Sequence, residues 1–304
     1  MYFERVKPSS PLEKYIACYW IAKVDGCKTI REINPNSNIC VCFHLGHMPK
    51  YKMVPRRYWC GKDSSVEAVL EWVEVDSVEA QNVIIGPHRS LILETSENYY
   101  CAVGIEFKTG IRKTFFGVDN ASLSGKVMPL GVDNSVLSDI PAIISRCDVD
   151  KIFRMIDNCL MDNFLPCVVG MSSDNILQSI IDEIIENPFD ANVSVMADKL
   201  NICVRTFERQ FKQYTGLSPK QFICVKKIGK VIDCMKKHPD YDLVQVVGAC
   251  GYYDQAHINR DFQIIGGLPA TQVFQNVRRY MDFTSEPFCL NYDVDGVCGF
   301  NLLI

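Results

Sequence analysis

The feature that most constrains the fold of this chain is an internal repeat in its last third. The tripeptide Arg-Gln-Phe at residues 209–211 is followed by Gly-Leu at 216–217, and Arg-Asp-Phe at 260–262 is followed by Gly-Leu at 267–268. Each member of the second set lies 51 residues after its counterpart in the first. Two copies of one supersecondary unit explain this constant displacement better than chance does.

The first copy is predicted to be a helix, a tight turn and a second helix. Val195, Met196 and Leu200 form the apolar face of the first helix. Asn201-Ile202 make the turn, and the second helix runs from about residue 204 to 214. One face of this second helix is apolar and another is basic, both at helical spacing. The apolar face holds Phe207, Phe211 and Tyr214, and the basic face holds Arg205, Arg209 and Lys212, with Thr206 nearby.

The second copy repeats this pattern with fewer basic residues. Leu243, Val246 and Val247 predict its first helix. Gly251-Tyr252 then turn the chain, and Asp254 is a suitable N-cap for the second helix. In that helix the inward and outward positions are again distinct, with Ile258, Phe262 and Ile265 facing the core and Gln255, His257 and Arg260 left for solvent or a ligand.

The charge of this region favours a nucleic-acid ligand. The whole chain has a formal net charge of −4, yet residues 199–237 contain ten lysine and arginine residues and only two acids, Glu208 and Asp233. A local excess of positive charge suits phosphate, and arginine and glutamine on an exposed helix can read guanine and adenine in the major groove. The alternative is that these stripes are the solvated polar faces of a helical bundle.

A set of residues spread over both copies fits a known family pattern. These residues are Ala197, Leu200, Arg205, Phe207, Arg209, Phe211, Gly216, Ser218 and Pro219 in the first copy, and Gly251, Tyr252, Asp254, Arg260, Phe262, Gly267 and Leu268 in the second. Over about residues 174–277 the chain thereby resembles the AraC/XylS family of bacterial transcription regulators. The resemblance implies an all-α domain with two helix-turn-helix units on double-stranded DNA, joined by a long helix at residues 222–235. The recognition helices would enter successive major-groove segments, roughly 34 Å apart.

The resemblance also implies roles for single residues. Lys212 and Lys220 are expected to contact phosphates, which position a protein on DNA without specifying the sequence. Base contacts are expected from Arg205, Thr206 and Arg209 in the first recognition helix, and from Gln255, Ala256, His257 and Arg260 in the second.

Three positions depart from the family pattern. Cys203 stands where the family usually has a serine cap, so we expect a weaker start of the first recognition helix. Gln263 replaces a usual lysine or arginine, and Pro269-Ala270 replace the usual Ser-Pro. Since the second unit also has few basic residues, we expect it to bind DNA more weakly than the first or to depend on DNA bending.

The first part of the chain has a different pattern. Residues 39–45 have the length and apolar density of a strand buried on both faces, and residues 83–85 and 102–107 look similar. Several short strands at this spacing predict a β-sandwich or a barrel. From about Pro141 the apolar residues recur mostly at helical spacing, which predicts one or two helices that link the halves or dimerise.

The chain is therefore expected to be an α+β protein with two domains. A regulatory domain at 1–168 is β-rich to about residue 140, a DNA-binding domain follows at 169–281, and the packing of the tail at 282–304 is left open. Residues 167–173 resemble a linker, with Asp174 as the cap of the next helix. The front half resembles an uncharacterised domain often fused to this DNA-binding module, which implies that it senses a small-molecule effector or forms a homodimer. The matching stretches are 11–20, 34–35, 43–46, 85–87 and 104–107.

The fifteen cysteines are scattered along the chain without a C-x-x-C pair. The first residues lack the apolar stretch of a signal peptide, and no segment approaches the roughly 18 apolar residues of a membrane helix. We therefore expect reduced thiols and a cytoplasmic protein without a membrane or a cofactor as partner. One alternative is a metal- or thiol-responsive regulator that uses Cys40, Cys42 and His44, which alternate on one strand face, with His47 just beyond.

No catalytic motif stands out in the sequence. G-x-S-x-G, a Walker loop, H-E-x-x-H and a four-cysteine zinc spacing are all missing from it, so we expect that the protein is not an enzyme. Regulators of the AraC/XylS family more often activate transcription than repress it. The resemblance therefore implies an activator, with RNA polymerase as a further partner. A helical adaptor that binds only proteins is the third alternative, and it predicts no salt-dependent affinity for DNA.

Overall fold

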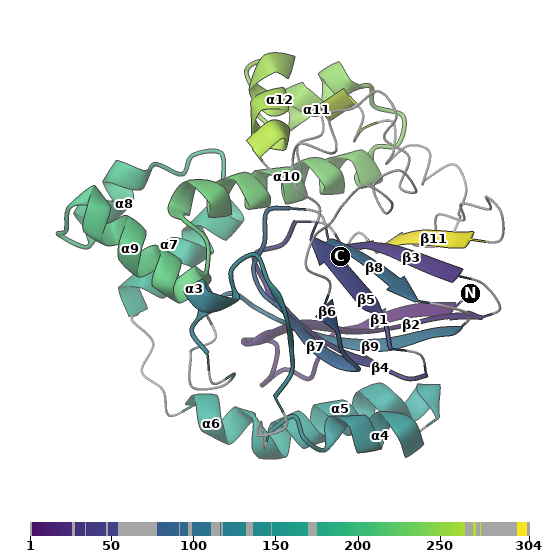
Figure 1. Ribbon diagram of the computed structural model, residues 1–304. Coiled ribbons are helices and arrows are strands. Elements are labelled where there is room, and N and C mark those ends of the chain that lie inside the picture. The colour runs from purple at the N-terminus through teal and green to yellow at the C-terminus, as the bar shows by residue number, and fades with distance from the viewer. Residues whose placement is uncertain are drawn as a thin grey trace.

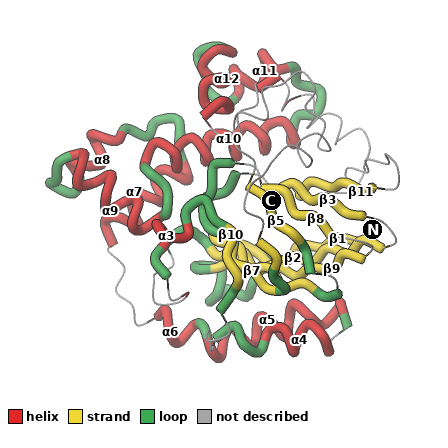
Figure 2. The backbone as a smooth tube through the Cα atoms, in the orientation of Figure 1, coloured by secondary structure: helices red, strands yellow, loops and turns green. Residues whose placement is uncertain are grey.

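The computed structural model has a β-rich amino-terminal part and a helical carboxy-terminal part, which confirms the predicted fold class (Figure 1). Strands gather in one half of the molecule and the helices after residue 175 in the other (Figure 2). The structure describes all residues except 1, 26–27, 34, 47, 54–77, 91, 97–98, 111–115, 117, 132–135, 147, 170–174, 265–269, 272–273, 275–296 and 303–304.

The larger of two sheets in the amino-terminal part has six antiparallel strands in the order β1-β2-β9-β4-β7-β10. The predicted strands at 39–45, 83–85 and 102–107 are interior strands of this sheet, and burial on both faces explains their apolar density. The strands are β1 (Tyr2–Val6), β2 (Ile16–Asp25), β4 (Ile39–His44), β7 (Asn82–Ile85), β9 (Tyr99–Phe107) and β10 (Val127–Pro129).

The second sheet has five strands in the order β11-β3-β8-β5-β6. These are β3 (Lys28–Ile33), β5 (Lys50–Met53), β6 (Val78–Glu79), β8 (Ile92–Ser96) and β11 (Val297–Leu302). β11 comes from the last residues of the chain and pairs in parallel with β3, whereas the other pairs are antiparallel. This pairing answers the question that the sequence left open, because part of the tail completes the amino-terminal domain.

Two apolar cores hold this domain together. One lies between the sheets around Trp20, Tyr51 and Tyr100. The other lies on the outer face of the larger sheet, which α4 (Ile140–Arg146), α5 (Val149–Asn163) and α6 (Leu165–Val169) cover (Figure 1). The predicted linker at 167–173 needs a correction, because residues 167–169 belong to α6, while residues 170–174, Asp174 included, lie outside the described residues.

The helical domain contains α7 (Asn175–Glu186), α8 (Val193–Lys199), α9 (Val204–Thr215), α10 (Pro219–Lys237), α11 (Leu243–Ala249) and α12 (Gln255–Ile264). These helices share a third apolar core. In α7 the buried residues are Leu177, Ile180, Ile181 and Ile184, which follow the i, i+3, i+4, i+7 pattern of one helix face. None of the described helices is long and apolar enough to span a membrane.

Candidate nucleic-acid interface

The first helix-turn-helix unit is formed by α8 and α9, and α9 is strongly amphipathic. Phe207 and Phe211 are fully buried, with ring centroids 5.5 Å apart. The opposite face carries Arg205, Arg209 and Lys212, all exposed as predicted. Because these three lie at i, i+4 and i+7, they form one stripe along the solvent side of the helix.

The turn between α8 and α9 is built by a left-handed residue. Asn201 has φ 53°, a conformation that asparagine tolerates better than most residues, and the N–H of Ile202 donates to the carbonyl of Ala197 at 3.2 Å. The predicted turn is therefore confirmed. The predicted apolar face of α8 was partly wrong, because Val195 is 51% exposed and the buried residues are Met196 and Ala197.

Cys203 occupies the N-cap of α9 but makes no side-chain hydrogen bond to the helix backbone. Its Sγ lies 3.3 Å from the hydroxyl of Thr206, and the hydrogen bonds from Thr206 lower the pKa of the exposed thiol. The helix consequently begins with a backbone N–H that a serine at this position could satisfy. This geometry agrees with the weak start that the sequence predicts.

The second unit is formed by α11 and α12, and its start is well capped. Asp242 and Gln245 make a reciprocal capping box at the beginning of α11. Gly251, with φ +75°, then turns the chain. The Oδ1 of Asp254 accepts the N–H of His257 at 2.7 Å, as expected of an N-cap at α12. These contacts fix α12 without a basic residue at its beginning.

The polar face of α12 is largely open. Gln255, Ala256 and Arg260 are exposed, whereas His257 is half-buried and its ring meets Tyr252 edge-on at a centroid distance of 5.0 Å. Ile258 and Phe262 are buried as predicted, and Ile265 lies outside the described residues. The sequence analysis did not single out Tyr253, which precedes the N-cap and is 93% exposed. An aromatic residue directly before a capping aspartate was the available signal.

A single helix joins the two units. The predicted connector at 222–235 is the centre of α10, whose 19 residues make it roughly 28 Å long at the usual rise per residue. A capping box between Ser218 and Gln221, followed by Pro219 in the first turn, fixes its beginning. α10 contacts α7, α9, α11 and α12, so it sets the spacing between the two recognition helices.

Some of the ten basic residues counted at 199–237 are engaged within the protein, so fewer than ten are available to DNA. Lys199 pairs with Glu183, and Lys227 lies 3.9 Å from Asp261 with both side chains only 15% exposed. Lys226 is half-buried and lines a cavity beside the amino-terminal domain. Arg205, Arg209, Lys212 and Lys220 are exposed and remain for an external anion.

The amino-terminal domain contacts the carboxy-terminal end of the first recognition helix. The side-chain amide of Asn120, in α3 (Asn120–Leu123), donates to the backbone carbonyl of Tyr214 at 2.6 Å. Gly216 caps α9 with φ +83°, and a Cβ at this position would lie 2.7 Å from the carbonyl oxygen of Asn120. The close approach therefore requires glycine for both its conformation and its size.

The residues of the metal alternative sit in the core of the amino-terminal domain. The sulfur atoms of Cys40 and Cys42 are 3.6 Å apart, so the two residues share a strand face as predicted. The Nε2 of His44 lies 2.6 Å from the carboxylate of Glu94, and its Nδ1 lies 2.9 Å from the carbonyl of Gln81. Among the residues that the structure describes, no group of three or more potential ligands could hold a metal ion.

The environment of His44 favours its charged form. Burial lowers the pKa of the imidazole, but the adjacent Glu94 carboxylate more than offsets this, so the pKa lies above its usual value. The hydroxyl groups of Tyr51 and Tyr100 donate to Glu94 at 2.7 and 3.2 Å. This buried pair is hydrogen-bonded on several sides, and we assign it a structural role between the sheets.

Residues 196–276 match a family model described as a helix-turn-helix domain, and residues 4–129 match one described as a domain of unknown function. Proteins named HTH-type transcriptional activator RhaS, from Salmonella arizonae and Salmonella newport, are 28% identical over 68 residues. That alignment covers 22% of this chain and 24% of the relatives, so the chain matches about a quarter of their length.

Among solved structures, ToxT from Vibrio cholerae aligns with a TM-score of 0.43 and 9% identity over 90% of this chain and 98% of ToxT. The match at residues 196–276 is to a helix-turn-helix domain, and the RhaS relatives are named as transcriptional activators, so these matches are to DNA-binding regulators and not to enzymes. Over residues 196–276 the chain is therefore similar to the helix-turn-helix domain of transcription regulators, behind a segment similar to a domain of unknown function, and both matches agree with the predicted resemblance to the AraC/XylS family.

Proposed function

We propose that this protein regulates transcription in the cytoplasm by binding a specific sequence in double-stranded DNA through α9 and α12. The observation that carries the proposal is the exposed stripe of Arg205, Arg209 and Lys212 on the second helix of the first unit. A helix with this face can lie in the major groove, where arginine bonds guanine in a bidentate fashion. α10 would hold α12 at a fixed distance, so that both recognition helices engage neighbouring groove segments.

The roles of single residues follow the exposure of their side chains. We propose base contacts for Arg205, Thr206 and Arg209 in α9, with phosphate contacts from Lys212 and Lys220. In α12 we propose base contacts for Gln255, Ala256, His257 and Arg260. His257 and Thr206 are only partly exposed, because each is engaged by a neighbour within the protein. They are expected to contribute less than the two arginines.

The test is a mobility-shift titration of the full chain on the upstream region of its own gene. Arg209→Ala should weaken specific binding about 5- to 150-fold, which corresponds to 1–3 kcal/mol for one bidentate contact. Arg260→Ala should cost less, because the second unit has fewer basic residues. Arg154→Ala is the matched control, since Arg154 is exposed on α5 in the other domain. Equal losses for Arg209→Ala and Arg260→Ala would count against the unequal roles.

The salt dependence of binding separates this proposal from a protein-binding adaptor. Phosphate contacts release counterions, so the affinity of the full chain for DNA must fall as salt rises. Replacing the phosphate-contacting Lys220 with glutamine should flatten the slope by about one unit. An affinity that does not change with salt would support the adaptor instead.

We further propose that the protein activates transcription together with RNA polymerase, and that the amino-terminal domain relays an effector signal to α9. The name of the RhaS relatives supports activation. The contact of Asn120 with Tyr214 supports the relay, because it joins the regulatory domain to the recognition helix directly. A reporter gene behind the natural promoter tests the sign of regulation. Higher expression without the protein would refute activation.

A further inference from the structure

A cluster of buried and half-buried side chains joins the second recognition helix, α12, to the connecting helix α10. Figure 1 shows α12 next to α10, and the two helices are in contact. The cluster, which we call the α12 latch, consists of Phe189 before α8, Cys224 and Lys227 in α10, Tyr252 in the turn, and Asp261 in α12. None of these residues is among those proposed to contact DNA. The latch can therefore affect DNA binding only through the position of α12.

Asp261 lies at the centre of the latch. One of its carboxylate oxygens, Oδ2, accepts a hydrogen bond from the Tyr252 hydroxyl at 3.0 Å and lies 3.9 Å from the Lys227 amine. Its backbone carbonyl accepts a hydrogen bond from the thiol of Cys224 at 3.3 Å. Burial, together with the Asp261 carboxylate, raises the pKa of the Tyr252 hydroxyl, so this group stays protonated and remains a donor. Directional contacts thus attach α12 to α10 and to the turn that precedes it.

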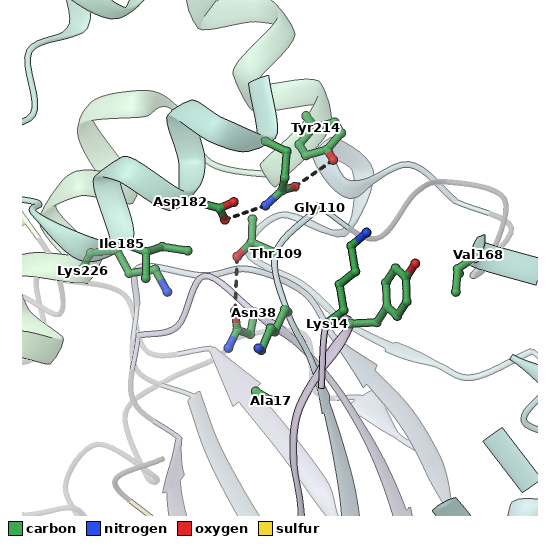
Figure 3. A pocket seen from close by; sticks show the side chains of 13 residues that line it. Lys14, Ala17, Asn38, Thr109, Gly110, Val168, Asp182, Ile185, Tyr214 and Lys226 are labelled. Carbon is green, nitrogen blue, oxygen red and sulfur yellow. Dashed lines mark hydrogen bonds between the residues drawn. The ribbon is translucent and has the colours of Figure 1, made fainter. Parts of the chain in front are cut away.

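Lys227 is enclosed by the Asp261 carboxylate and two aromatic rings. Its amine lies 5.5 Å from the centre of the Phe189 ring and 6.0 Å from that of the Tyr252 ring, distances at which a cation is attracted to the face of a ring. The two rings meet edge-on with their centroids 5.1 Å apart. By contrast, Figure 3 shows the neighbouring Lys226 in the wall of the cavity beside the amino-terminal domain. Adjacent lysines of α10 therefore have different surroundings, and Lys227 is engaged within the helical domain.

The latch adjoins two of the residues that we propose to contact bases. Asp261 directly follows Arg260, and consecutive helix residues point about 100° apart, so Asp261 faces the latch while Arg260 is exposed. The ring of His257 meets that of Tyr252 edge-on at 5.0 Å. The hydrophobic burial beneath α12 is non-directional, whereas hydrogen bonds favour one geometry. The polar contacts of Asp261 therefore fix the rotation of α12 about its axis and, with it, the direction of Arg260.

We infer that the α12 latch sets the position of α12 relative to α9, and so determines which separation of two half-sites on DNA the protein accepts. A half-site is the stretch of duplex that one recognition helix contacts. Lys227, Tyr252 and Asp261 are then positioning residues, which act through the base-contacting side chains of α12. This inference rests on the proposed function and deepens it. A rigidly held second helix binds strongly at one spacing and poorly at others, whereas a loosened helix binds more weakly but tolerates several spacings.

Mobility-shift titration of the full chain on four DNA duplexes tests the latch. The first is the natural operator, located by footprinting upstream of the gene, and the second and third have one base pair more or one fewer between its half-sites. Each change rotates the second half-site by about 35° and moves it by roughly 3.4 Å. The fourth keeps the first half-site and has a scrambled second one. Wild type should bind both altered spacings at least about 10-fold more weakly than the natural operator.

Lys227→Met should remove the spacing preference. We expect it to bind the natural operator about 3- to 10-fold more weakly than wild type, and the altered spacings within about 3-fold of the natural one. Its affinity for the first half-site alone should equal that of wild type, which also shows that the variant is folded. Asp261→Asn and Tyr252→Phe should act in the same direction. Lys227→Arg, which keeps the charge and can stack on the rings, should retain the wild-type preference.

Lys230→Met is the matched control, because it removes the same charge from an exposed position about one turn further along α10. This control should keep the wild-type spacing preference. The inference is overturned if wild type shows no preference, or if Lys227→Met and Asp261→Asn keep the wild-type ratio of affinities between natural and altered spacings. Equal weakening on all four duplexes also overturns it, because that pattern indicates a folding defect alone. Failure of wild type to bind its natural operator specifically would contradict the proposed function, and the inference with it.

Discussion

Docking of the amino-terminal domain on α9 can be measured with two glycine substitutions. Gly216 and Gly251 both have left-handed backbones, with φ +83° and +75°. Gly216 faces the amino-terminal domain, where an added Cβ would lie 2.7 Å from the carbonyl oxygen of Asn120 and 3.0 Å from the Pro87 ring. At Gly251 an added Cβ meets no atom within 4 Å. The second site therefore reports the conformational cost alone.

The two costs can be separated by their difference. An L-residue in the left-handed conformation costs about 1–2 kcal/mol at either site. A methyl group forced against backbone at Gly216 adds about 1–3 kcal/mol of overpacking, unless the domains separate. Gly216→Ala is therefore expected to lose about 1–3 kcal/mol more of the unfolding free energy than Gly251→Ala.

Urea denaturation of the full chain, followed by far-ultraviolet circular dichroism, provides the comparison. If the added methyl group instead separates the domains, hydrogen exchange at the carboxy-terminal end of α9 should increase in Gly216→Ala and stay unchanged in Gly251→Ala. Equal losses of stability together with unchanged exchange would refute the reasoning, because the domain contact would then have no energetic effect.

Two further predictions concern single side chains. Cys203→Ser should raise the Tm of the helical domain by about 1–3 °C, since a serine hydroxyl at the N-cap can accept a backbone N–H of the first turn of α9, which the Cys203 side chain does not; a lower Tm in a calorimetric scan would contradict this. The raised pKa of His44 implies stability that is complete below about pH 6.5 and is lost as the pH rises through the folded-state value. The difference in unfolding free energy between wild type and His44→Gln should therefore shrink from pH 6.5 upward, and a constant difference would argue against a charged pair.

The helix-turn-helix units were predictable because they depend on short-range spacing. The 51-residue displacement, the turn at Asn201 and the cap at Asp254 are local features, and each is found where the sequence placed it. The error at Val195 was also local. The residues of α8 that pack toward the core are Val193, Met196, Ala197 and Leu200, which follow the i, i+3, i+4, i+7 pattern. Counting the small residue Ala197 as apolar would therefore have identified the correct face of α8.

What the sequence could not reveal is the contact between distant segments. Lys14 and Lys226 share a cavity although they lie on different domains, and no spacing rule connects them. The pairing of Lys227 with Asp261 is likewise tertiary, so counting basic residues overstated the charge that is free to face DNA. Such juxtapositions depend on how whole elements pack, for which a single sequence holds no periodic signal.

The parallel pairing of β11 with β3 has a consequence for how the protein is made. β3 has β8 as its neighbour on one side, and among the described strands its other edge pairs with residues 297–302. During synthesis that edge has open backbone N–H and C=O groups until the whole helical domain has left the ribosome. A nascent chain stopped before residue 297 would therefore expose a strand edge able to pair with other chains, and we expect truncation at this end to promote aggregation rather than to release a free DNA-binding fragment.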